Sequence, residues 1–338
     1  MRTNNDTTRS LFLLILVLAA AWVGFFPCFA HDFIHRFFYM PFLGIIAATV
    51  ANTTPAAAGI VYFPVLTRLD VLPVTAVQFS LLIQAYGMGL GTFKWYLVNR
   101  KLFIANVLPV CIAGGVSGVV LSIAVFPIQN PELLTLVFNF AALLLTQVIF
   151  FSILLKRSYP RLTVKMTPRA ITVLAVFSVI GGLVSGWIGF GIDTMFYFIL
   201  TVIFRINPAA AIVTSISLMA VVSVAGTAAN VIFHQVPLSL WFSAIPGVTI
   251  AGLFVASYVA VKLGARNVLL LFTALLSLDF FYTFWTQQAV PVSQAVRHGC
   301  TYMLIIYLVY IHVRVFKEGY SDIKADLGTF RPEKSQQC

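Results

Sequence analysis

Long apolar stretches, separated by short polar or basic segments, dominate this chain of 338 residues. An apolar stretch of about 20 residues is long enough to cross a bilayer as a helix. About eight stretches meet this criterion and predict full spans: approximately 11–29, 74–98, 103–126, 131–155, 208–233, 238–262, 267–287 and 300–316. The pattern predicts an all-α integral membrane protein.

Two further apolar stretches are interrupted by helix breakers. The stretch 38–66 contains Ala51-Asn52-Thr53-Thr54-Pro55, and the stretch 170–204 contains three glycines between 186 and 191, followed by Asp193. Proline removes a helix donor, and glycine loosens the backbone. Non-helical backbone at membrane depth survives only where protein or water satisfies it. Each stretch therefore predicts a re-entrant hairpin of two half-length helices that meet at a polar tip; a single kinked span is the alternative.

Composition excludes a soluble protein, because 60% of the residues are hydrophobic and only 9% are charged. The net charge of +11 arises mainly from Lys and Arg in loops and tails, where topology places them, so nucleic acid is not an expected partner. The loop 156–169 carries five basic residues and is expected to be cytoplasmic: Lys156, Arg157, Arg161, Lys165 and Arg169. With both hairpins counted, nearly all the other basic clusters also fall inside. We expect an inner-membrane protein with both termini in the cytoplasm.

The opening apolar run resembles a signal peptide but is long for one, so we interpret it as a retained first span. His31, Asp32 and His35 have helical ligand spacing, yet no further ligand lies nearby in the sequence. We therefore expect no metal site, and no motif indicates a cofactor.

The chain contains an internal repeat. A shift of 135 residues aligns 62–92 with 197–227 without a gap. Shared residues include Pro73 and Pro208, Ser80 and Ser215, and Gly91 and Gly226. Each half then comprises one hairpin and three spans, so the halves have inverted topology, as in many secondary transporters.

The expected organisation has five parts: an N-terminal transmembrane helix (1–37), repeat 1 (38–155), a basic cytoplasmic loop (156–169), repeat 2 (170–290) and a C-terminal transmembrane helix with a cytoplasmic tail (291–338).

The candidate site lies where the hairpin tips meet. The second half of a broken helix exposes backbone N–H groups, which bind anions. Polar or small residues at the tips and on the following helices are the substrate-binding candidates: Asn52, Thr53, Thr54, Gln78, Ser80, Gly189, Gly191, Thr194, Thr214 and Ser215. The alternative is ordinary, because Ser and Thr also pack helices together and bond to nearby carbonyls.

Two acidic residues lie within apolar segments. Asp193 follows the second break, and Asp279 lies within the span 267–287. Acidic residues at membrane depth are costly, so both are candidates for proton coupling. Asp193 has two alternatives, capping of the half-helix and direct substrate contact; for Asp279 the alternative is a helix–helix hydrogen bond.

The repeated unit is a glycine-rich break, a half-helix and then Pro-x-x-Ala-x-x-x-Ser, which begins at Pro73 and again at Pro208. With the segment 182–191, this unit resembles the TauE/SafE family of sulfite and organosulfonate permeases over roughly 40–290. The first copy departs from the family pattern, with 51–55 in place of a glycine-rich tip and Phe79-Ser80 in place of Thr-Ser. The resemblance implies a transporter without enzymatic activity that moves a small anion, sulfite or an organosulfonate such as sulfoacetate.

Two alternatives stay open: a permease for another small organic solute, such as a carboxylate or amino acid, or a non-transporting assembly partner in the membrane. The expected partners are the small anion and the lipid bilayer, and a homodimer is compatible with this architecture.

Overall fold

The computed structural model describes residues 4–154 and 162–256, together with isolated helical positions between 258 and 313. All regular elements among the described residues are helical, as predicted. They are α1 (Asn4–His35), α2 (Met40–Thr53), α3 (Gly59–Arg68), α4 (Pro73–Val98), η1 (Arg100–Leu102), α5 (Leu108–Ala124), α6 (Pro131–Leu154), α7 (Pro168–Ile188), α8 (Ile192–Phe198), η2 (Ile199–Ile203), α9 (Pro208–Phe233), α10 (Leu238–Ile250) and η3 (Ala251–Val255). The elements η2 and η3 are π-helical turns that continue α8 and α10.

Within the described part of the chain, five helical segments are long and apolar enough to cross a membrane: Arg9–His35, Pro73–Val98, Pro168–Ile188, Pro208–Phe233 and Leu238–Val255. Large apolar side chains are exposed on their outer faces, including Phe12, Ile180 and Ile232. Such a surface requires lipid as its solvent, so the described fold is that of a membrane protein.

Several predictions fall outside the described residues. These are most of the spans 267–287 and 300–316, of which only isolated positions are described, and also the C-terminal tail, Asp279, and the basic residues Lys156, Arg157 and Arg161.

Prolines and polar caps begin the long helices. Pro73, Pro168 and Pro208 each stand at the start of a helix, where a missing N–H costs nothing. The side chain of Thr167 accepts from Ala170 N at 3.3 Å, and that of Asn207 accepts from Ala209 N at 3.0 Å. These local signals explain why the predicted and observed starts of these helices agree closely.

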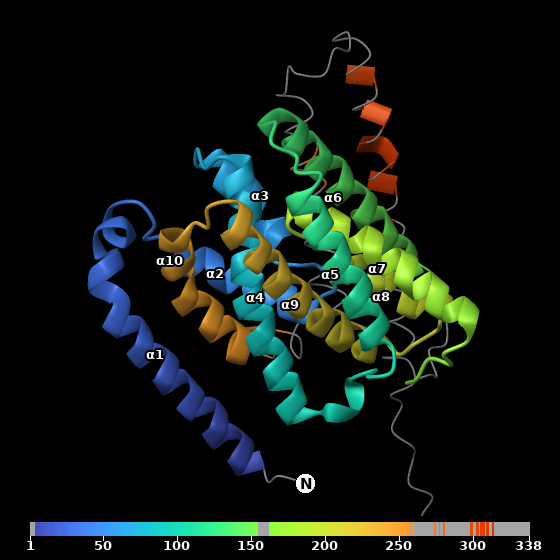
Figure 1. Cartoon of the computed structure of the whole chain (residues 1–338), viewed down its shortest axis with the longest axis horizontal. Coiled ribbons are helices and arrows are strands. Elements are labelled where there is room, and N and C mark those ends of the chain that lie inside the picture. Colours follow the sequence, from blue (N-terminus) through green and yellow to red (C-terminus); the bar gives the residue numbers. More distant parts are fainter. Residues whose placement is uncertain are drawn as a thin grey trace, which may run out of the picture.

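The sequence repeat has a structural counterpart. Helices α4 and α9 both have 26 residues, and both of their ends differ by the offset of 135 (73 to 208, 98 to 233). Packing is repeated as well: α3 lies on α4 as α8 lies on α9, and α5 packs against α7 as α10 packs against α2. Helices α4 and α9 contact each other near the middle of the molecule (Figure 1). The opposite orientation of the two halves across a bilayer stays a prediction.

The segment from α7 to α9 folds back on itself. Asn106 Nδ2 donates to Val164 O at 2.6 Å, just before α7, while Thr214 Oγ1, in the first turns of α9, accepts from Ile104 N at 3.1 Å. Both ends of the segment therefore lie beside the same connection between α4 and α5. This contact pattern supports a hairpin over a single kinked span.

The expectation of half-length arms is wrong for α7. This helix has 21 residues and is therefore about 31 Å long. The physical reason is that Gly186, one of the three glycines expected to loosen the backbone, lies inside the helix instead. Gly182 packs against the backbone of Gly115 in α5, and Gly186 packs against Ser122. Small residues at such positions let two membrane helices approach closely.

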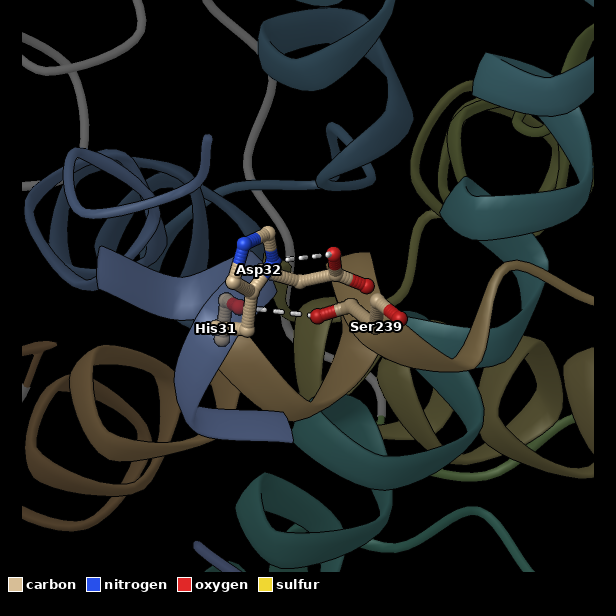
Figure 2. A network of polar contacts seen from close by, with 4 residues as sticks. His31, Asp32 and Ser239 are labelled. Carbon is tan, nitrogen blue, oxygen red and sulfur yellow. Dashed lines mark hydrogen bonds and ion pairs between the residues drawn. The ribbon is translucent and has the colours of Figure 1, made fainter. Parts of the chain in front are cut away.

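Helix α1 lies beside α10 at one edge of the molecule (Figure 1). Trp22 stacks on Phe242 with ring centroids 5.2 Å apart, and its Nε1 donates to Phe242 O at 3.0 Å. At the end of α1, His31 Nδ1 lies 3.8 Å from Asp32 Oδ1. The two side chains form a polar network with Ser239, at the start of α10 (Figure 2). These contacts attach α1 to the rest of the fold.

We expect Gly182→Ala to destabilise the protein. The added Cβ would lie 2.3 Å from Gly115 O, a backbone atom that cannot move aside freely. Overpacking of this kind costs about 1–3 kcal/mol of unfolding free energy. The control is Gly89→Ala in α4, whose Cβ meets nothing within 4 Å. Thermal unfolding in detergent measures both, and equal midpoints would contradict the packing described here.

Candidate functional site

The two helix breaks contact each other directly. Thr194 Oγ1, in the first turn of α8, donates to Pro55 O at 2.6 Å, and Gln84 Nε2, on α4, donates to Gly189 O at 2.7 Å. A Cβ placed on Gly59 would lie 2.6 Å from Gly189 O. The backbone of each break is thus satisfied in part by side chains that lie far away in the sequence.

The second break depends on left-handed backbone. Gly189 has φ 79° and Gly191 has φ 135°, conformations that L side chains adopt at a cost. A Cβ on Gly189 would also lie 2.8 Å from Ser80 Cβ. The predicted residues Ser80 and Gly189 are therefore neighbours, and the turn passes directly over α4.

Most predicted hydroxyl donors bond within their own helix. The acceptors are Thr49 O for Thr53, Val50 O for Thr54, Ala76 O for Ser80, Ala210 O for Thr214 and Ile212 O for Ser215, at 2.7–2.9 Å. Local bonding, the alternative interpretation, describes these five residues in the present conformation. An anion would have to compete with the carbonyls for these donors.

Thr214 is bound to the connection between α4 and α5. Its hydroxyl accepts from Ile104 N at 3.1 Å, and none of its hydrogen bonds joins it to a helix break. Asn52, by contrast, lies in the last turn of α2, next to the first break, and is 2% exposed.

Asp193 is buried at the second break, with 1% of its surface exposed. Its Oδ1 accepts from Gly191 N at 3.3 Å, and its Oδ2 has no hydrogen-bond partner among the described residues. One oxygen therefore stabilises the start of α8, as a cap does, and the other is available for a proton. Coupling and capping are both compatible with this geometry, and direct substrate contact by Asp193 stays a prediction.

A pocket of about 210 Å³ lies beside the second break, between α4, α5, α6, α7 and the end of α9. Gln78, a predicted site residue, lies in its wall, as do Gly186 and Trp187 at the end of α7. Trp187 Nε1 donates to Phe126 O at 2.7 Å, which holds the indole at the rim.

Sequence reasoning missed the other polar side chains of this wall, which are Ser122, Gln129, Asn230 and His234. The signal was present, because a buried Ser or Asn inside an apolar span needs a reason. It was not used because these residues lie far from both breaks in the sequence.

We expect Thr194→Val to destabilise the protein more than Thr201→Val. Both threonines are buried in the same hairpin arm, with 0% and 1% exposure. Thr194 bonds to Pro55 O in the other break, whereas Thr201 bonds only to carbonyls of its own helix turn. Loss of the first bond leaves a buried carbonyl short of a partner and costs about 1–3 kcal/mol. Thermal unfolding of the two variants measures the difference, and a larger effect at Thr201 would contradict a structural contact between the breaks.

Comparisons with known proteins agree with this architecture. The family model described as Sulfite exporter TauE/SafE matches residues 40–280, which include both breaks, the pocket and helices α2–α10. Helix α1 lies outside the matched region. A search of curated proteins and a search of solved structures each returned no match. Since the matched region covers most of the chain, this protein belongs to the sulfite exporter TauE/SafE family.

Proposed function

We propose that this protein is a secondary transporter that moves sulfite or an organosulfonate, such as sulfoacetate, across the cytoplasmic membrane. Its family consists of exporter-type permeases for anions of this kind. The observation that carries the proposal is the buried contact between the two breaks, in which Thr194 Oγ1 donates to Pro55 O, while Gln84 of α4 donates to Gly189 O. Broken helices at corresponding positions of two repeats are where secondary transporters bind their substrates.

The chemistry of the pocket is consistent with an anion. Its described lining combines neutral polar groups with His234, and none of the described lining residues is acidic. Amide and hydroxyl donors recognise an oxyanion without the cost of a buried countercharge. The volume of about 210 Å³ has room for a molecule with a sulfonate group and a short carbon chain.

The proposed mechanism is alternating access between the two repeats. The pocket opens beside the loops 127–129 and 234, which the charge pattern assigns to the outer side. By the repeat symmetry, a conformation with the breaks rearranged would open a corresponding pocket on the cytoplasmic side. The substrate would pass from the pocket, beside Gly186, to the contact between the two breaks. Its passage would involve no covalent chemistry.

Flux into proteoliposomes tests the substrate class. We expect uptake of sulfite and sulfoacetate by the purified protein, and no comparable uptake of matched carboxylates, amino acids or chloride. Uptake confined to carboxylates or amino acids would favour the permease for another solute. No flux of any compound by a well-folded protein would favour the non-transporting partner.

Asn230→Leu should weaken sulfite transport. Asn230 is 3% exposed and lines the pocket, and a hydrogen bond to a charged group contributes about 1.5–3 kcal/mol. At low sulfite concentration we expect the transport rate to fall by at least about tenfold. The control is Asn139→Leu in α6, a residue that is 6% exposed and bonds to Thr135 O in its own helix. Equal losses in the two variants would contradict a substrate path through this pocket.

Asp193→Asn separates the roles of coupling and capping. The amide keeps an oxygen that can accept from Gly191 N, so the cap and the fold should survive, but the carboxylate charge is lost. If Asp193 carries the coupling proton, transport driven by a pH gradient is lost while exchange of substrate for substrate persists. Unchanged pH-driven transport would assign Asp193 to capping alone.

A further inference from the structure

An apolar groove runs between α1 and α10, at one edge of the molecule. Two hollows of about 370 Å³ and about 200 Å³ form it, and Leu18, Trp22 and Ile245 line both of them. The larger hollow reaches Leu238, at the start of α10, and the smaller one reaches Ile250, at its end. The two hollows together are called the α1 groove below.

The α1 groove offers hydrocarbon contacts and few hydrogen bonds. Its described lining contains four polar side chains, and three of them bond within the protein. Trp22 Nε1 donates to Phe242 O at 3.0 Å, and the hydroxyls of Tyr86 and Thr249 lie 2.7 Å apart. The fourth side chain, Trp241, has a buried Nε1 without a hydrogen-bond partner among the described residues. An apolar occupant therefore fits the groove, whereas a hydrated or ionic one would lose its solvation there.

The length of the groove matches one leaflet of a bilayer. Helix α10, which runs along it from Leu238 to Ile250, has 13 residues and is therefore about 20 Å long. The hydrocarbon core of a bilayer is about 30 Å thick, so one leaflet contributes about 15 Å. The charge pattern assigns the loop before α10 to the outer side. An acyl chain that enters beside Leu238 would thus reach the middle of the bilayer near Ile250.

A polar network lies at the outer end of the α1 groove. Phe29 is in the groove wall, and Asp32 follows it by about one helical turn. The Asp32 carboxylate hydrogen-bonds to Ser239 and lies 3.8 Å from His31 Nδ1 (Figure 2). Because Ser239 directly follows Leu238 of the groove wall, the network holds α1 against α10 at the point where the groove opens.

The exposed polar side chains of the segment 31–36 are basic. They are His31, His35 and Arg36, and the rings of the two histidines lie 4.8 Å apart. A guanidinium binds a phosphate through charge-assisted hydrogen bonds, often two at once, and an imidazole adds a further donor. The outer end of the groove is therefore suited to the phosphate of a lipid headgroup.

A phospholipid is the occupant that satisfies both parts of this surface. A second copy of the chain would cover the groove with apolar side chains but would supply no anion for the basic end. A free phosphate or sulfite ion would bind the basic end and leave the groove uncovered. A phospholipid carries an acyl chain and a phosphate at the distance that a membrane-spanning groove with a basic outer end requires.

We propose that the α1 groove binds an acyl chain of one phospholipid of the outer leaflet, whose phosphate lies beside Arg36. The lipid would fill the space between α1 and α10 and so stabilise their contact. Helix α1 lies outside the region that the family model matches. The site is separate from the helix breaks and does not depend on the identity of the transported solute.

Lipid binding to the delipidated full chain in detergent tests the proposal. The probes are palmitoyl-oleoyl phosphatidylglycerol and the diacylglycerol with the same chains, and native mass spectrometry measures the bound fraction. Ala21→Phe fills the larger hollow, and displacing about two methylene groups should weaken phosphatidylglycerol binding about tenfold. The control is Ala20→Phe, an exposed neighbour that lies outside the described lining. Arg36→Gln should weaken phosphatidylglycerol binding but not diacylglycerol binding, and Arg36→Lys should restore most of it.

Three results would overturn the proposal. The first is equal phosphatidylglycerol binding by the Ala20→Phe and Ala21→Phe variants. The second is unchanged phosphatidylglycerol binding by Arg36→Gln. The third is a dimer of the wild-type protein that Ala21→Phe alone abolishes, which would assign the groove to a second copy. Unfolding midpoints without lipid check that each variant folds, and should Ala21→Phe fail, Ala19→Phe fills the smaller hollow and takes its place.

Discussion

The structure depends on the hydrogen bonding of the backbone at two helix breaks. A break inside a lipid-exposed protein leaves carbonyls and amides that no solvent reaches, and each unsatisfied group costs several kcal/mol. Here the breaks lie against each other, and side chains of one region serve the other: Thr194 donates to Pro55 O and Gln84 donates to Gly189 O. The backbone amides at the second break, which are buried, bond to side chains of the same hairpin. Ser185 Oγ accepts from Ile192 N at 3.0 Å, and Asp193 Oδ1 accepts from Gly191 N. Neither break is fully satisfied without its surroundings, so the two hairpins form one unit.

The contact between the breaks is made by hydrogen bonds, whereas the outer helix arms pack against their neighbours through glycines. The outer arms pack through glycines against neighbouring helices, as Gly182 does against Gly115 and Gly44 does against Ala244. Such close backbone contacts are rigid and cannot be exchanged easily. The contact between the breaks uses a few hydrogen bonds, each with a net contribution of about 0.5–1.5 kcal/mol. A cost of a few kcal/mol is within the range that a bound substrate can supply when it favours one conformation. Rigid arms around a junction held by a few hydrogen bonds are what the proposed alternating access requires.

Much of this architecture could be predicted from the sequence, because it follows from local signals. Proline at helix starts, the breakers around Pro55 and Gly189, and the offset of 135 residues located the helices, the breaks and the repeat. What failed was the interpretation of Gly186 as backbone loosening, whereas Gly189 and Gly191 do form the break. Glycine serves both loose and tightly packed backbone, and only the position of α5 distinguishes the two uses. The pocket residues Asn230 and His234 were missed for a similar reason, since tertiary contact alone brings the end of α9 to the second break. The bonds of the Thr53 and Ser80 hydroxyls to nearby carbonyls depend on rotamers that the sequence does not reveal.

In the proposed mechanism, the two repeats open a path to the contacting breaks from opposite sides of the membrane. Single cysteines at the matched positions Gln78 and Val213 test it most directly, in a background with the native cysteines replaced. Gln78 lines the pocket, whereas Val213 is 2% exposed. The rate of labelling by a membrane-impermeant thiol reagent is measured from each side, with and without sulfite. Under alternating access we expect Gln78→Cys to be labelled from the outside and Val213→Cys only from the cytoplasm. Sulfite should change the two labelling rates in opposite directions. Rates that change in the same direction, or labelling of both positions from one side, would contradict it.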